Sequence, residues 1–129
     1  MSPRSRSASL IAALTLLSAC TQMQPEVVRP AGAPVYPPTQ FVEMLDAPPT
    51  RPYQQIAVIE LAGEQGALRT QVIAQIRTQA QQIGADAVIL QDLSRTAPAV
   101  PRLNPTTGMY ETTGGQPVPA FKGIAIKYR

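Results

Sequence analysis

Few residues of this chain have side chains suited to catalysis, and the most informative of them is the only cysteine. Cys20 is the single thiol, and the chain has no histidine. Without histidine, neither a Ser–His–Asp arrangement nor a Cys–His pair is available for nucleophilic catalysis. Histidine and cysteine are the ligands that zinc and copper prefer, and Cys20 is the only such residue in the chain. We therefore expect no catalytic residue, no metal ligand and no cofactor.

Carboxylates offer the remaining route to acid–base chemistry. The candidates are Asp46, Glu60, Glu64, Asp86 and Asp92. Their spacing does not predict that any two of them meet in a defined role, so a hydrolase with a carboxylate pair is only a third function class. Asp86 is the most tempting candidate. A short acidic side chain between a helix and a strand commonly accepts backbone N–H groups, and we favour that structural role.

The position of the cysteine indicates export. Arg4 and Arg6 precede an apolar run at positions 10–17, and the small residues Ser18 and Ala19 follow it. A positive start, a short apolar run and small residues are typical of a secretory signal peptide, here residues 1–19. Crossing a bilayer takes roughly 17–25 apolar residues, and no stretch of the chain approaches that length. We therefore expect no transmembrane helix.

The tetrapeptide Leu17-Ser18-Ala19-Cys20 resembles the lipobox of bacterial lipoproteins. The resemblance implies cleavage before Cys20 and acylation (palmitate among the chains) of its thiol and new amino group, which makes Cys20 a lipid-attachment site. Because Thr21 rather than aspartate follows, the resemblance implies the outer membrane, on its periplasmic side. Two other readings of Cys20 stay open: a free thiol after an ordinary secretory cut, and a buried structural cysteine.

Cleavage before Cys20 would leave 110 of the 129 residues, enough for one domain. The chain has 11 basic and 8 acidic residues, and losing Arg4 and Arg6 would leave nine against eight, a formal net charge of +1. The basic residues are scattered, so we expect no nucleic-acid partner. A single cysteine allows no internal disulfide, and the core must stabilise the domain alone.

A change of composition follows the cysteine. Residues 20–40 are rich in proline and poor in large apolar residues. Proline removes a backbone donor and disfavours helices and central strands. The composition predicts a disordered or polyproline-II linker, which at ~3.1 Å per residue could hold the domain roughly 60 Å from the bilayer.

The folded domain is expected at 41–129. Apolar and β-branched runs predict strands at 41–45, 53–61, 85–93 and 121–129. A helix is predicted at 67–83, with one apolar stripe made by Leu68, Val72, Ile76, Ala80 and Ile83, and with Gly84 ending it.

These elements predict an α+β fold: a four-stranded mixed sheet with one helix packed on one face, in the order β-β-α-β-β. The strands on either side of the helix should run parallel to each other. Residues 94–120 form an unusually long connection that contains either a hairpin arm near Tyr110 or a mobile loop.

The segment AQQIGADAVIL (80–90) and the final strand GIAIKY (123–128) resemble the YbjQ-like and RcsF-like small α/β domains, over roughly residues 53–129. That resemblance implies the fold and, for some members, envelope signalling or metal binding. This chain lacks the disulfide cysteines of the signalling domains and has no histidine to bind a metal.

One helix covers one face of a sheet, which leaves the second face to be explained. Ile124, Ile126 and Tyr128 should point away from the side that bears Phe121, Gly123 and Ala125. In the strand 53–61, Ile56 and Val58 should share one face and alternate with Ala57, Ile59 and Leu61 on the other, so both faces of that strand are apolar. An apolar second face needs a cover: the 94–120 loop, a second copy, or a protein partner.

The sequence therefore favours a membrane-anchored envelope lipoprotein that is not an enzyme and acts as an interaction, sensor or structural module. The alternative is a small-molecule or envelope-polymer binding domain with the 94–120 loop as its lid.

Overall fold

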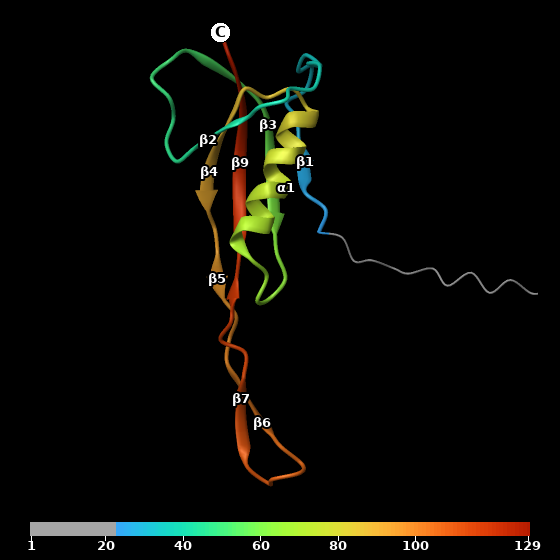
Figure 1. The fold of residues 1–129 in the computed structure, drawn as a ribbon, viewed down its shortest axis with the longest axis vertical. Coiled ribbons are helices and arrows are strands. Elements are labelled where there is room, and N and C mark those ends of the chain that lie inside the picture. The colour runs from blue at the N-terminus through green and yellow to red at the C-terminus, as the bar shows by residue number, and fades with distance from the viewer. Residues whose placement is uncertain (1–22) are drawn as a thin grey trace, which may run out of the picture.

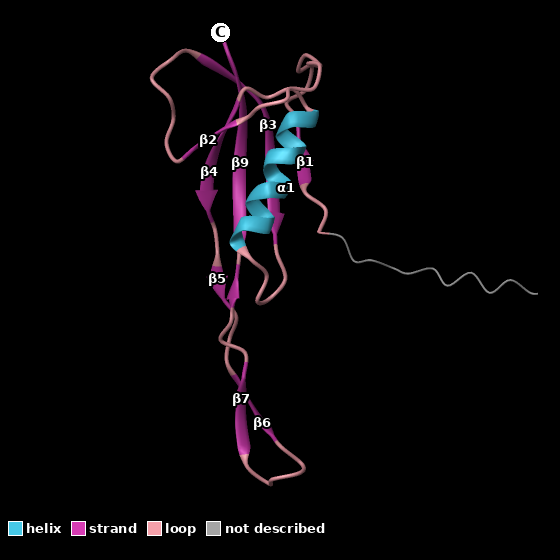
Figure 2. Cartoon of the chain, viewed as in Figure 1, coloured by secondary structure: helices cyan, strands magenta, loops and turns pink. Residues whose placement is uncertain are grey.

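The protein is described from a computed structural model over residues 23–129, and its body is a mixed five-stranded sheet with one helix on one face (Figures 1 and 2). The strands of this sheet are β1 (Glu26–Val28), β2 (Glu43–Leu45), β3 (Tyr53–Ala62), β4 (Ala87–Asp92) and β9 (Ala120–Tyr128), and the helix is α1 (Arg69–Gln82). Four further strands, β5 (Arg95–Thr96), β6 (Val100–Leu103), β7 (Tyr110–Thr113) and β8 (Pro117–Val118), form two small two-stranded sheets.

The sheet has the spatial order β1-β3-β9-β4-β2, with β9 at its centre. β9 pairs antiparallel with both β3 and β4, so these two strands run parallel to each other, as the sequence predicted, with β9 between them. Only β2 and β4 pair in parallel within the sheet. The α+β class with one helix and a mixed sheet is confirmed, whereas the predicted count of four strands is corrected to five by β1.

The helix packs its predicted stripe against the sheet. Val72, Ile76 and Ala80 are fully buried, and Ile83 is nearly so. Leu68 is an exception, since 60% of its surface is exposed. It precedes the helix as the N-cap residue with an extended backbone, which takes its side chain off the stripe. Gly84 follows with φ +78°, as expected of the residue that ends a helix.

A β-bulge in β3 changes which residues face the helix. Gln55 lies opposite Ile126 and Ala57 lies opposite Ala125, so the extra residue Ile56 falls between two regular pairs. Ile56 consequently packs with Ala57 in the core beneath the helix. The expectation that Ile56 and Val58 share a face is therefore wrong.

The proline-rich N-terminal segment belongs to the domain from residue 23 onward. β1 pairs with β3 at the edge of the sheet, and Val27 packs against the main core. Further along, the Thr39 hydroxyl donates to the Ala85 carbonyl oxygen at 2.8 Å. The predicted disordered linker is thus corrected for residues 23–40. An edge strand of three residues fits between Pro25 and Pro30 because proline is tolerated at sheet edges and strand ends.

Residues 94–119 form a long ribbon that leaves the end of the sheet where β4 stops and β9 starts (Figure 1). We call this ribbon the arm. β5 pairs with β8 at its base, and β6 pairs with β7 further out, with Leu103 opposite Tyr110. Of the two alternatives for this segment, the structure therefore shows the hairpin, and it does not lie over the sheet.

Candidate interaction surfaces

The predicted lipid-attachment residue, Cys20, and the whole signal peptide lie outside the described residues. The described chain begins at Met23, three positions after the cysteine. Within residues 23–129, no helix combines the length and the apolar character needed to cross a bilayer.

Asp86 is held at the start of β4 by groups from β9. Its carboxylate accepts a hydrogen bond from Lys127 Nζ at 2.8 Å and another from the Tyr128 backbone N–H at 2.9 Å. Partial burial alone would raise the pKa of Asp86, but these hydrogen bonds and the charge of Lys127 outweigh burial and lower the pKa below its ordinary value. An ionised carboxylate fixed in this way joins two strands, which is the structural role that the sequence favoured.

The other candidate carboxylates are kept apart. Asp92 accepts a hydrogen bond from Arg69 at 2.7 Å, and hydrogen bonds from Ser94, with that from Arg69, lower the pKa of Asp92 to about 2. Glu60 pairs instead with Lys122 at 3.6 Å, on the face of the sheet opposite Asp92. Among the described residues, no three His, Cys, Asp or Glu side chains cluster in a way that could hold a metal ion.

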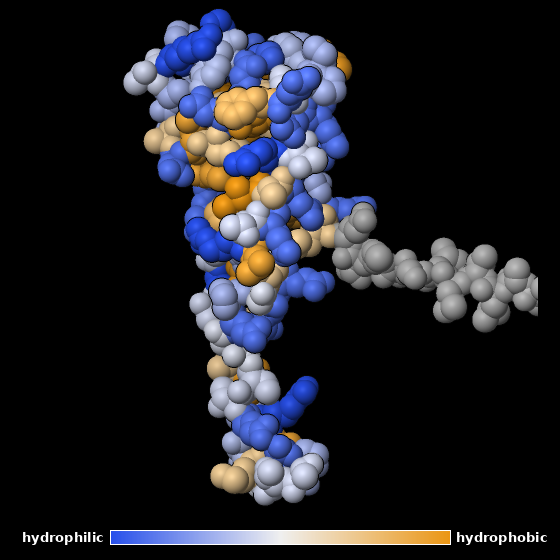
Figure 3. Space-filling model, viewed as in Figure 1, coloured by the Kyte–Doolittle hydropathy of each residue, from blue (hydrophilic) through white to orange (hydrophobic). Residues whose placement is uncertain are grey.

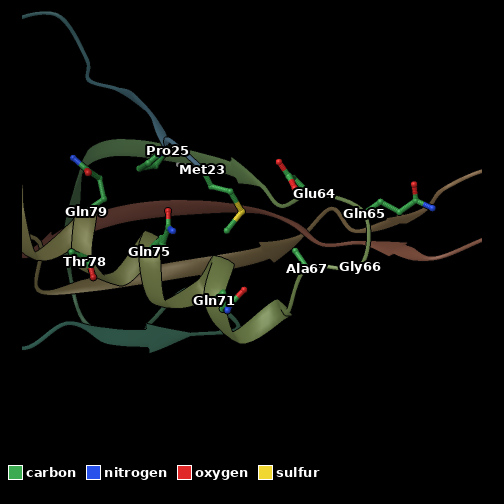
Figure 4. A pocket seen from close by; sticks show the side chains of 10 residues that line it. All are labelled: Met23, Pro25, Glu64, Gln65, Gly66, Ala67, Gln71, Gln75, Thr78 and Gln79. Carbon is green, nitrogen blue, oxygen red and sulfur yellow. The ribbon is translucent and has the colours of Figure 1, made fainter. Parts of the chain in front are cut away.

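A hollow with a volume of about 800 Å³ lies along the outer side of α1 (Figure 4). Its walls come from the N-terminal segment, the loop between β3 and α1, and the helix itself. Amide side chains dominate the lining, and Glu64 is its only charged residue. The lining residues are Met23, Pro25, Glu64, Gln65, Gly66, Ala67, Gln71, Gln75, Thr78 and Gln79. Each amide both donates and accepts hydrogen bonds, so this hollow suits an uncharged polar ligand.

The face of the sheet opposite α1 carries an aliphatic row that crosses all five strands. We call this surface the open face. Strand register places its residues side by side in the order Val28, Val58, Ile124, Ile89, Leu45. Exposure falls along the row from Val28, which is 56% exposed, to Ile89, which is 5% exposed. The row is therefore an apolar surface that is open at the β1 edge.

Beyond this row the open face is closed by aromatic side chains. Ile126 is fully buried in a cluster that Tyr53 and Tyr128 flank. The Arg51 guanidinium lies over the ring of Tyr128, 4.4 Å from its centre, and the Tyr128 hydroxyl donates to Glu43 at 3.1 Å. The partition of β9 side chains between the two faces is thus confirmed, since Phe121 and Ala125 lie in the helix-side core and Ile126 does not.

On the helix side, α1 leaves β4 and β2 partly uncovered, and apolar atoms reach the surface there (Figure 3). Phe41 is 76% exposed and lines a shallow hollow with Val42, Met44 and Arg77.

The end of the arm is a further exposed apolar surface. Every residue of β6 and β7 is exposed, including Leu103 at 52% and Tyr110 at 76%, and Met109 beside them is 67% exposed. The sequence predicted a possible hairpin here and gave the segment two possible roles, a lid over a ligand and a cover for the second face of the sheet. Sequence reasoning missed the amide-lined hollow, for which the spacing of Gln71, Gln75 and Gln79 on one side of the helix was the available signal.

Comparison with known proteins adds nothing to these observations: no family model matches the chain, and neither a curated protein nor a solved structure matches it significantly.

Proposed function

We propose that this protein is a lipid-anchored lipoprotein of the bacterial outer membrane, facing the periplasm, and that it acts without catalysis by contacting a protein. The anchor rests on the sequence alone: the predicted signal peptide, residues 1–19, ends directly before Cys20, and the tetrapeptide Leu17-Ser18-Ala19-Cys20 spans the cleavage site. Three acyl chains on Cys20 would make attachment effectively permanent, because each buried CH₂ contributes about 0.8 kcal/mol.

The observation that carries the contact role is the aliphatic row of the open face. A sheet face that met only water would alternate polar residues with the apolar residues of the core. Here the open face instead presents Val28, Val58 and Ile124 side by side at the β1 edge. Neither α1 nor the arm lies over this surface, and exposed apolar patches commonly mark protein contacts. The partner is a second copy of the chain or another envelope protein.

Two measurements test this function. The intact mass of the membrane-extracted protein should show a chain that begins at Cys20 and carries acyl groups, and Cys20→Ser should abolish processing and acylation. A mature chain without acyl mass would contradict the anchor.

The contact is tested by a photo-crosslinking residue at position 28 in cells, with position 82 on the exposed end of α1 as the matched control. We expect crosslinked products only from position 28, and their mass distinguishes a second copy from another protein. Equal labelling at both positions, or none at 28, would contradict the open face as the contact surface.

A second candidate function is the binding of a small molecule or an envelope polymer. The amide-lined hollow beside α1 favours it, because such a lining suits uncharged polar groups. A lid role for 94–120 has less support, since no residue of that segment lines the hollow. Co-sedimentation with isolated peptidoglycan, lost in Gln75→Ala and retained in Arg77→Ala, would favour this candidate over protein contact.

A further inference from the structure

The arm is long, narrow and almost uncharged. The ten residues from 94 to 103 form one side of it, and at about 3.3 Å per residue they give a length of roughly 30 Å. Arg95, Arg102 and Glu111 are its only charged residues, and none of them lies in the eight-residue end from Leu103 to Tyr110. We call these eight residues the tip.

Several backbone groups of the tip form hydrogen bonds within it. Asn104 organises the turn: its backbone N–H donates to the Met109 carbonyl oxygen at 2.8 Å, and its carbonyl oxygen accepts from the Gly108 N–H at 2.8 Å. Its side chain accepts from the Thr106 N–H at 2.9 Å and donates to Glu111 at 2.7 Å. Because these polar groups already have partners, moving the tip out of water costs less than it would for an open loop.

The large apolar side chains of the tip are exposed to solvent. Leu103 and Tyr110 form a cross-strand pair next to Met109, and each of the three has more than half of its surface exposed. Tyrosine favours the boundary between headgroups and acyl chains, because its ring is apolar and its hydroxyl is polar. Arg102, directly before Leu103 in β6, lies where it can meet lipid phosphates when the tip is buried.

The short connection to Cys20 brings the bilayer within reach. β1 is fixed in the sheet from Glu26, so only six Cα–Cα steps separate that strand from the cysteine. Such a connection spans at most about 20 Å, whatever its conformation, instead of the roughly 60 Å expected of a free linker. The chain enters β1 near Glu60 and Lys122, towards the end of the sheet from which the arm leaves (Figure 1).

We propose that the arm tip is a second bilayer contact, in which Leu103, Met109 and Tyr110 insert into the surface of the membrane that holds Cys20. The proposal rests on the proposed lipid anchor. The two attachments would incline the long axis of the sheet to the membrane, because the arm is longer than the connection to Cys20. A protein partner fits the tip less well, since a standard interface takes about 20–30 residues on each side and the tip has eight.

The absence of tryptophan from the chain allows a direct test. The full lipidated protein is prepared as Tyr110→Trp and, as the matched control, Gln82→Trp, an exposed position at the far end of α1. Each is reconstituted in vesicles of phosphatidylethanolamine and phosphatidylglycerol with bromine on the acyl chains. We expect the fluorescence to fall by about half or more at position 110 and to stay unchanged at 82. Adding Met109→Asp to Tyr110→Trp should abolish the quenching.

Three results would overturn the proposal: equal quenching at both positions, no quenching at 110, or an indole at position 110 that is shielded from aqueous iodide but unaffected by the brominated lipid. The last result would assign the tip to a second copy. The intact mass of the same samples separates the two hypotheses. Missing acyl groups would contradict the anchor, whereas an acylated Tyr110→Trp protein whose fluorescence is not quenched would contradict only the tip contact.

Discussion

Gly123 lies beneath α1, against side chains of the helix and of β4, and adding one methyl group there should destabilise the protein. A Cβ at this position would lie 2.8 Å from Val88 Cγ1 and 2.9 Å from Ile76 Cγ2. Carbon atoms pack best at about 3.5–4.0 Å, so the new atom would be too close on two sides. Overpacking costs about 1–3 kcal/mol, and the reduced freedom of the unfolded chain returns about 0.4–1 kcal/mol.

We therefore expect Gly123→Ala to lower the free energy of unfolding by roughly 1–2 kcal/mol. That change corresponds to a fall in Tm of about 4–8 °C per kcal/mol for a domain of about this size. Urea unfolding measures the free energy directly, and Lys122→Ala, on the opposite face of the same strand, is the control. Its exposed ion pair with Glu60 contributes at most about 1 kcal/mol.

A double-mutant cycle with Val88→Ala tests the cause. Val88→Ala removes Cγ1, the atom nearest to the new methyl group, so the double variant should be more stable than the sum of the two single effects predicts. A coupling of about 0.5 kcal/mol or more is expected for residues in contact. An additive cycle, or a Gly123→Ala variant as stable as the wild type, would refute the close approach of helix and sheet.

Three further outcomes are expected. Ile76→Asp should unfold or severely destabilise the domain, because it places an unpaired carboxylate in a fully buried site, whereas exposed Arg77→Ala should leave the Tm nearly unchanged. Asp86→Asn should lose about 1–3 kcal/mol at pH 7. Because the pKa of Asp86 is lowered in the folded state, its contribution to the free energy of unfolding is present above pH ~4 and is lost as the pH falls through the folded-state pKa. In the Asn variant, the free energy of unfolding should therefore depend less on pH in this range. Finally, replacing the segment between Ala97 and Gln116 by a two-residue turn should shift the Tm by only a few degrees, since the Ala97 N–H already donates to the Gln116 carbonyl oxygen at 2.9 Å. Loss of the cooperative unfolding transition in this variant would show that the arm stabilises the sheet and helix.

The sequence predicted the elements whose periodicity is strong. The stripe of Val72, Ile76 and Ala80 repeats with the helical period, and Gly84 supplies the positive φ that ends the helix. The alternation in β9 likewise separated Phe121 and Ala125 from Ile126 correctly. In each case one local pattern is sufficient to predict the element, because the spacing of apolar residues within a short segment shows which side chains share a face.

Other features depend on contacts that no local pattern encodes. β1 has only Val27 and Val28 as apolar residues, and its strand conformation comes from pairing with β3, some thirty positions away. The bulge at Ile56 likewise arises from register against β9. The arm could be proposed from its length, but its direction away from the body depends on how β5 and β8 pair at its base.

The place of β9 in the sheet determines when the domain can fold during synthesis. The other four strands of the sheet all precede β9 in the chain, yet β3 and β4 are joined only through it. Until residues 120–128 emerge, β3 lacks its longest pairing partner and Ile76 has no sheet centre to pack against. Every earlier intermediate therefore lacks a closed core, so the five-stranded sheet cannot form before residues 120–128 have been made. For the lipoprotein proposed above, which would cross a membrane in an extended state, the strand that completes the sheet would also delay folding until residues 120–128 have been translocated.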